Sequence, residues 1–331
     1  MTPAPPVVVT LSYRLGAVLP VAAVSLLRDG AALHADTDIP VELAQSCGAH
    51  PVGDAVQGLL LTLDPSTGAA ARWVATGASV LATPEPAGAA LLDAVAVMDR
   101  LRSPGGCPWD AEQTHRSLMP YLIEEAYELY QALEDLEDLE NNDTAALREE
   151  LGDVLLQVLF HARVAQEAPE GQEGFDIDAV ATGLVTKLVS RHPHLFAGGE
   201  QVRTAAEQEV RWEQLKRAEK RRESSIDGVA LTQPAVALAA KLVSRVTKAA
   251  FPSDLLPSAD GGTGGLLFAL AAAAKLAGED PEAALRRVAR RFAQDVRAAE
   301  RSARAAGLNA QELTPQQWRE HWRVSPQRAH R

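Results

Sequence analysis

The sequence predicts a mainly α-helical protein with a small α/β region at its N-terminus. Three observations support this fold class. Residues 1–90 contain only ten charged side chains and no lysine, and short apolar runs alternate there with Ala-rich stretches. Residues 91–227 show the apolar spacing of consecutive amphipathic helices. Residues 228–331 are again helical in pattern and are expected to form a degenerate helical repeat.

In residues 1–90 we expect strands that alternate with short helices. The runs VVVTL, GLLLTL and SVLAT have the length and the continuous apolar character of buried strands. Gly and Pro residues separate them from Ala-rich stretches. Because the region holds no cluster of carboxylates, we expect it to be dispensable for chemistry.

The following segments are expected to be helices separated by clear breaks. A helix over ALLDAVAVMDRLRS ends at the PGG that follows it, and CPWD is predicted to be a loop. Two long helices over 116–139 and 144–167 are joined by a polar hinge, where Asp143 or Thr144 caps the second helix. Further helices are expected over DIDAVATGLVTKLVSRH and TAAEQEVRWEQLKRAEKRRES. The last helical region begins at GVALTQPAVALAAK and is broken by FPSDLLPSADGGTGG.

Composition and charge exclude several classes of function. The chain carries a net charge of −12, whereas non-specific nucleic-acid binding requires a basic surface. Two cysteines are too few for a disulfide framework or a Cys-rich zinc site. No signal-peptide pattern and no apolar run of membrane-spanning length is found. We therefore expect a cytoplasmic protein that binds neither nucleic acid nor membranes.

The negative charge is concentrated in one segment, since residues 110–160 contain 14 Asp and Glu against two Arg. The two long helices of this segment repeat one acidic step, in which two adjacent glutamates precede a third carboxylate. The carboxylates are Glu124, Glu125 and Glu128 in the first helix and Glu149, Glu150 and Asp153 in the second. In each helix they span an arc of about 100° beside an apolar stripe.

A solvated acidic face is the usual interpretation of such residues, but three features favour a metal site. Neither trio has a Lys or Arg four residues later to pair with. Apolar residues flank both acidic arcs. A short hinge would make the two helices antiparallel neighbours, and facing carboxylates repel unless a divalent cation neutralises them.

The ligand types indicate which cation and which substrate to expect. A set of carboxylates without His suits Mg²⁺ or Mn²⁺ rather than zinc. Mg²⁺ commonly also binds substrate phosphates, so the sequence indicates a polyphosphate ligand. Lys187 and Arg191 lie four residues apart on one predicted helix face and could bind phosphate oxygens, although solvated pairs at this spacing are common. Trp109 either covers a base or closes one end of a helical bundle, and the sequence leaves both alternatives open.

Four blocks over residues 91–222 resemble the MazG family of nucleoside triphosphate pyrophosphohydrolases. In order, they are LRSPGGCPWDAEQTHRSLMPYLIEEAYELYQAL, EELGDVLLQVLFHARVAQE, KLVSRHPHLFAG and RWEQLK. The family signature is EExxE followed by ExxD. The resemblance implies an all-α NTP pyrophosphatase helical bundle, Mg²⁺ as cofactor and hydrolysis of an NTP to NMP and pyrophosphate, in nucleotide-pool house-cleaning. Residues 1–90 weakly resemble a shortened remnant of a tetrapyrrole-methylase-like domain.

By position, the resemblance implies a role for each residue of the candidate site. The Mg²⁺ ligands would be Glu125, Glu128, Glu150 and Asp153. Glu124 would be an additional ligand or the base that orients water. The residues that contact the nucleotide would be Lys187, Arg191 and Trp212.

Alternative functions and the assembly state follow from the same features. Related α-helical enzymes act on dUTP or phosphoribosyl-ATP, and a catalytically weak nucleotide-binding regulator is an alternative from another class. The complete set of carboxylates disfavours the regulator, since a binding protein could lose one without penalty. Both acidic helices are apolar on two sides, which one hairpin cannot cover, so we expect a homodimer, as the resemblance also implies.

The C-terminal region resembles a decayed second copy of the MazG domain, which some family members carry twice. Residues 149–165 align with residues 261–277 at an offset of 112. The pattern of Leu and Ala persists, but the three carboxylates are replaced by Gly261, Gly262 and Gly265. Only the first copy therefore retains the predicted ligands.

Overall fold

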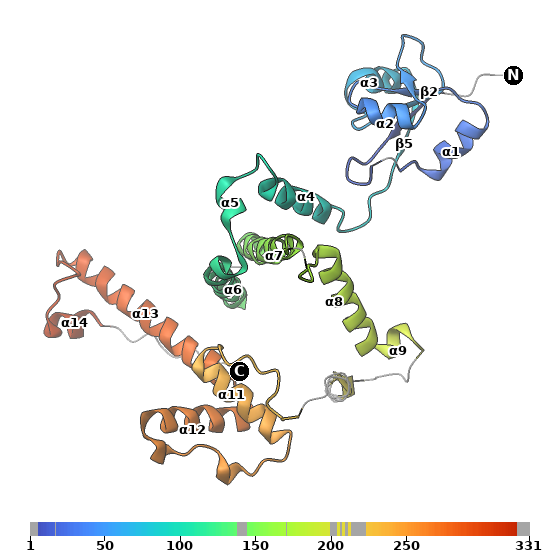
Figure 1. Cartoon of the computed structure of the whole chain (residues 1–331). Helices are drawn as coiled ribbons and strands as arrows, with labels where there is room; N and C mark the ends of the chain where they lie inside the picture. Colours follow the sequence, from blue (N-terminus) through green and yellow to red (C-terminus); the bar gives the residue numbers. More distant parts are fainter. Residues whose placement is uncertain are drawn as a thin grey trace. The chain divides into compact units, whose positions relative to one another are not determined.

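The computed structural model describes residues 6–16, 18–137, 144–169, 171–198, 204–205, 207–208, 211–212 and 223–322. The chain divides into two compact units, residues 1–199 and 200–331, and each is described by itself. Figure 1 shows the N-terminal sheet and the helices that follow it along the chain. Among the described helices, none combines the length and the apolarity that crossing a membrane requires.

The first unit begins with a parallel sheet. Its strands are β1 (Val7–Thr10), β2 (Leu33–Ala35), β3 (His50–Pro51), β4 (Leu59–Thr62) and β5 (Ser79–Ala82). They lie in the order β3-β2-β4-β1-β5, and every neighbouring pair is parallel. Three strands coincide with the apolar runs of the sequence, and β1 and β4 are almost wholly buried because they lie inside the sheet. The prediction of a small α/β region at the N-terminus is confirmed.

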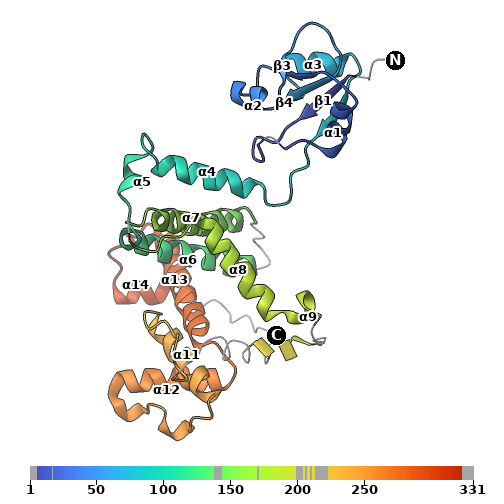
Figure 2. The same cartoon turned by 45° about the vertical axis from the view of Figure 1, so that its right-hand side comes forward.

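Helices cover both faces of this sheet, and Figure 2 shows them around it. They are α1 (Val21–Arg28), α2 (Val41–Ser46) and α3 (Gly68–Ala75). α1 and α2 pack on the face that includes Val9 and Leu61, whereas α3 packs on the face that includes Val8 and Leu60. Alternate residues of a strand point to opposite faces, so β1 and β4 supply both cores.

The rest of the first unit is helical, as predicted. The helices are α4 (Ala90–Arg102), α5 (Pro108–Glu112), α6 (His115–Glu137), α7 (Thr144–Gln166), α8 (Ile177–Arg191) and α9 (Pro193–Phe196). α6 and α7 lie side by side in both views (Figures 1 and 2). They are antiparallel, because His115 at the start of α6 contacts His161 near the end of α7, with 2.8 Å between their Nδ1 atoms. Buried Met98, Leu118 and Phe160 join α4, α6 and α7 in one core.

Residues 108–110 of the segment CPWD are helical and Cys107 is the N-cap of that helix, which corrects the prediction of a loop. Pro108 is the first residue of α5, a position where its missing N–H costs no hydrogen bond. The amide of Cys107 donates to the carbonyl oxygen of Leu101 at 2.8 Å. Gly106 lies so close to the end of α4 that a β-carbon there would be 2.2 Å from the same carbonyl oxygen. These contacts fold CPWD back onto α4.

The other predicted helices agree with the structure to different extents. α6 and α7 match the predicted spans to within two residues at each end. Thr144 begins α7, while Asp143 lies outside the described residues. The helix predicted over residues 204–224 also lies mostly outside the described residues.

The second unit includes further helices with short 3₁₀ turns between two of them. They are α11 (Ala235–Thr247), α12 (Gly262–Leu276), α13 (Pro281–Ala305) and α14 (Pro315–His321). α12 begins inside GGTGG, so the predicted break is shorter than expected, because the Leu and Ala run extends its helix back to Gly262. At the offset of 112, buried Leu159 and Phe160 of α7 align with buried Ala271 and Ala272 of α12. The degenerate repeat itself stays a prediction.

Candidate metal and nucleotide site

Three of the predicted carboxylates meet between α6 and α7. Glu125 comes from α6, and Glu150 and Asp153 come from successive turns of α7. One carboxylate oxygen from each lies within 4.8 Å of the other two, and all three residues are half-buried. The antiparallel packing of α6 and α7 brings the two acidic steps to the same level. The sequence reasoning identified these residues correctly as neighbours.

Without a cation, the carboxylates of Glu125, Glu150 and Asp153 repel one another. Burial raises the pKa of the Glu125 carboxyl above its usual range, and the charges of Asp153 and Glu128 raise it further, as does a hydrogen bond with Glu128. Burial also raises the pKa of Glu150, followed by the charges of Glu128 and Asp153. Glu128 therefore lies close to the trio, although its side chain is more exposed.

The donor atoms fit a divalent cation. Oε2 of Glu150 is buried and has no hydrogen-bond partner among the described residues, which is costly for a carboxylate oxygen. A cation placed among the three carboxylates would supply that missing partner and offset the mutual repulsion. The donors are all oxygens, which suits Mg²⁺, Mn²⁺ or Ca²⁺ better than a soft metal.

The other predicted site residues lie outside this cluster of three carboxylates. Glu124 is exposed on α6, next to Glu125, and its charge contributes to the raised pKa of that neighbour. Lys187 is exposed on α8, whereas Arg191 is buried one turn later on the same helix. Trp212 belongs to the second unit and is half-buried there. The roles of these residues stay predictions.

Trp109 contacts one aromatic residue of α6 and one of α7. Its ring lies edge-on to Tyr121 of α6, with 6.0 Å between centroids, and edge-on to Phe160 of α7, with 6.4 Å between centroids. The residue is nevertheless 51% exposed. Tyr121 and Phe160 were not predicted as neighbours of the site, although the helical wheels of α6 and α7 place both on the same arcs as the carboxylates.

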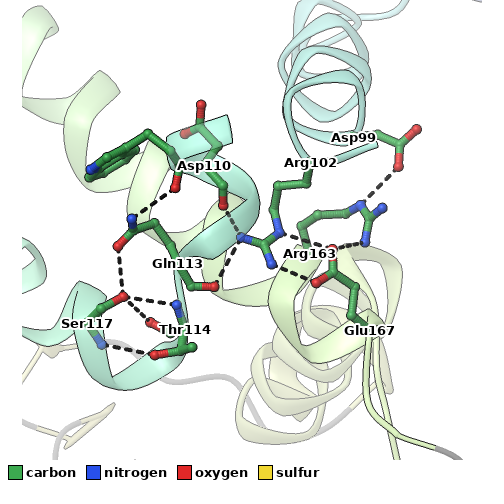
Figure 3. A network of polar contacts seen from close by, with 9 residues as sticks. Asp99, Arg102, Asp110, Gln113, Thr114, Ser117, Arg163 and Glu167 are labelled. Atoms are coloured by element: carbon green, nitrogen blue, oxygen red, sulfur yellow. Dashed lines mark hydrogen bonds and ion pairs between the residues drawn. The ribbon is translucent and has the colours of Figure 1, made fainter. Parts of the chain in front are cut away.

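A polar network holds α5 in place (Figure 3). Arg102 at the end of α4 donates from Nε and Nη2 to the two carboxylate oxygens of Glu167, at 3.0 and 2.6 Å. Its Nη1 donates to the backbone carbonyl oxygens of Asp110 and Gln113. The hydrogen bonds from Arg102 hold the pKa of Glu167 below its usual range. The network was not predicted, since Arg102 and Glu167 are 65 positions apart.

Comparison with known proteins gives consistent matches. The model of the MazG nucleotide pyrophosphohydrolase domain matches residues 113–196, and that of the MazG N-terminal domain matches residues 6–81. The chain is 39% identical to a nucleoside triphosphate pyrophosphohydrolase of Mycolicibacterium smegmatis, over 96% of this chain and 95% of the relative. A protein of the same name from Mycobacterium tuberculosis is 38% identical over 96% and 94%. An uncharacterized 26.1 kDa protein of Streptomyces cacaoi is 49% identical over 64% of this chain and 84% of the relative.

Proposed function

This chain belongs to the MazG family, and from that premise we propose that it hydrolyses nucleoside triphosphates to NMP and pyrophosphate between α6 and α7. The observation that carries the proposal is the convergence of Glu125, Glu150 and Asp153. Such a half-buried cluster of carboxylates is suited to a cation that neutralises a polyphosphate. The names of the two full-length relatives supply the reaction that geometry alone does not specify.

The family and the acidic cluster together point to a divalent cation, and Mg²⁺ is our proposal, with Mn²⁺ as a substitute. Glu125, Glu150 and Asp153 would hold the ion, and Glu128 would complete the set from the next turn of α6. When bound, a divalent ion lowers the pKa of a coordinated water and neutralises charge on phosphate oxygens. Glu124, exposed beside these ligands, would orient the attacking water as a base or add a further ligand.

The basic and aromatic residues are proposed to bind the rest of the nucleotide. Lys187 and Arg191 lie one turn apart on α8, which packs against α7, and would bind phosphate oxygens and stabilise the leaving pyrophosphate. Trp109 would contact the nucleoside, whereas the role of Trp212, which belongs to the second unit, stays a prediction. Trp109 lies beside α6 and α7, the helices that carry the carboxylates.

We also propose that the protein acts as a homodimer. Large apolar side chains are exposed along α6, α7 and α8 of the first unit, among them Ile123, Leu151, Leu156, Leu184 and Val185. A helical bundle normally buries such faces. Because exposed apolar residues occur on all three helices around the site, a second copy of the first unit is the partner that would cover them.

A product assay tests the proposed function. The purified protein is incubated with each NTP, dUTP and phosphoribosyl-ATP in the presence of Mg²⁺, and the products are separated by ion-exchange chromatography. We expect NMP and pyrophosphate in equal amounts. Release of orthophosphate and NDP, or binding of every nucleotide without turnover, would contradict the proposal.

A further inference from the structure

Tyr121 and the buried Phe160 lie on the carboxylate-bearing faces of α6 and α7, toward one end of the pair. Tyr121 precedes Glu125 by four residues, so the two side chains point within about 40° of each other on α6. Phe160 follows Asp153 by seven residues, which places them within about 20° of each other on α7. Because the helices are antiparallel, the start of α6 and the end of α7 lie at the same end of the pair.

Trp109 and Tyr121 form an exposed aromatic surface at this end, whereas Phe160 is buried in the core. The indole of Trp109 contacts both Tyr121 and Phe160 edge-on and remains half exposed, so one part of the ring packs and another faces solvent. The surface lies about one to two helical turns, or roughly 5–11 Å, from the carboxylates along the helix axes. In a nucleotide, the sugar separates the phosphates from the base in the same way.

Arg102 fixes the position of this indole. Its guanidinium contacts the carbonyl oxygens of Asp110, which follows Trp109 on α5, and of Gln113, the residue directly after α5. The opposite edge of the guanidinium forms a two-bond ion pair with Glu167, and its central carbon lies 5.4 Å from the centroid of the Phe160 ring. The side chain of Arg102 is only 3% exposed. The buried guanidinium of Arg102 thus joins α5 to Glu167 at the end of α7 (Figure 3), and it also contacts Phe160.

The Trp109 backbone is held from the other side as well. The side-chain amide of Gln113 donates to the carbonyl oxygen of Trp109 at 2.9 Å. The same amide group accepts from the hydroxyl of Ser117 at 2.8 Å, which ties α5 to the first turn of α6. A half-exposed tryptophan on a helix of five residues would otherwise be free to move, so these bonds order a side chain that solvent reaches.

We propose that Trp109 and Tyr121 form the exposed surface on which the nucleobase stacks, that buried Phe160 supports Trp109 from the core, and that Arg102 is the residue that positions Trp109. The inference rests on the proposed function and adds where the base binds. Stacking on an aromatic face tolerates every base. The platform therefore contributes affinity for nucleosides in general rather than for one base.

Variants of the platform separate base binding from phosphate binding. We would measure KM for an NTP and the inhibition constant of inorganic tripolyphosphate, which carries phosphates but no base. Trp109→Ala is expected to raise KM by about tenfold, since stacking contributes about 1–3 kcal/mol per base. The inhibition constant of tripolyphosphate should stay unchanged. Trp109→Phe, which keeps an aromatic face, should restore KM to near the wild-type value.

The role of Arg102 is tested on the same two constants. Arg102→Lys cannot reproduce the forked contacts and should raise KM while leaving tripolyphosphate inhibition unchanged. Glu167→Gln, a milder change, should raise KM less. If Arg102 acts through Trp109, combining Arg102→Lys with Trp109→Ala should raise KM no further than Trp109→Ala alone. Arg163→Lys is the matched control, because Arg163 pairs with Asp99 and Glu167 and makes no hydrogen bond to α5 among the described contacts.

A spectroscopic readout is independent of turnover. Titration with an NMP should quench tryptophan fluorescence in the wild type, and the quenching should largely disappear in Trp109→Phe. The inference is overturned if Trp109→Ala keeps the wild-type KM, if tripolyphosphate inhibition weakens in parallel with KM, or if quenching persists in Trp109→Phe. Wild-type protein that releases no pyrophosphate would instead contradict the proposed function.

Discussion

Carboxylate oxygens of Glu125 on α6 and Asp153 on α7 lie within 4.8 Å of each other. The charge of Asp153 adds to burial in raising the pKa of Glu125, so the two residues oppose each other in the protein alone. A divalent cation between them would convert that repulsion into attraction. The relationship therefore links the stability of the first unit to metal binding.

Removing one of the opposed charges should stabilise the metal-free protein. The pKa of Glu125 is raised in the folded state, so the folded protein loses stability as the pH rises through the ordinary glutamate value of about 4.3 toward the raised value. Glu125→Gln removes that loss without changing volume. Its Tm in a chelator should exceed that of the wild type at pH 7, and the difference should vanish as the pH falls below about 4. Thermal melts across this range check the prediction, and a lower Tm at pH 7 would contradict it.

Metal binding should be visible in the same melts. Mg²⁺ that binds only the folded state raises Tm, and a variant that has lost a ligand gains less. We expect Asp153→Asn to shrink the Mg²⁺-induced increase in Tm while the protein stays folded. Glu173→Gln is the control, because Glu173 is exposed between α7 and α8 and away from the trio in sequence. Unfolding of Asp153→Asn in the absence of metal would show that the carboxylate is structural.

The proposed dimer predicts a sensitive position on α8. Val185 is 59% exposed in the single chain, and a charge there would be buried in the interface. Val185→Asp should convert a dimer into a monomer, as measured by light scattering at micromolar concentration. The matched control is Val21→Asp on α1, where valine is 83% exposed and which lies outside α6, α7 and α8. A wild-type monomer would rule out the dimer outright.

The N-terminal region should be dispensable for chemistry. A chain that begins at Leu91 retains α5, α6 and α7 with all four candidate ligands. It loses the ion pair of Arg14 with Asp93 at 2.8 Å, which is partly exposed and far from the trio in sequence. We expect the shortened protein to keep its turnover of NTP. A folded but inactive protein, judged by circular dichroism and pyrophosphate release, would show that the sheet takes part in the reaction.

The sequence predicted the site residues that share one face of a helix, because their spacing follows the period of the helix. The acidic steps lie on helices long enough for the wheel to be reliable, and a short hinge leaves antiparallel packing as the simple arrangement. This is why Glu125, Glu150 and Asp153 could be predicted to meet. The same reasoning located β1 and β4, because buried parallel strands are continuous apolar runs, and the edge strand β5 also coincides with an apolar run although its residues are mostly exposed.

The contacts that hold α5 depend on residues far apart in the chain. CPWD has the Pro and Gly neighbours of a loop, and its five-residue helix is stabilised by Arg102 rather than by its own composition. Nothing local distinguishes Arg102 from any basic residue in the last turn of a helix. Its partner Glu167 directly follows α7, and the pairing appears only once α4 and α7 have packed.

The central claim is that the carboxylates between α6 and α7 hold the cation that NTP hydrolysis requires. Pyrophosphate release in Mg²⁺ should be measured for the wild type, Glu125→Gln and the control Glu173→Gln at equal protein concentration. The account predicts that Glu125→Gln loses turnover by about two orders of magnitude or more, since a metal site contributes several kcal/mol to the barrier, while Glu173→Gln matches the wild type. Equal pyrophosphate release by Glu125→Gln and Glu173→Gln would contradict it.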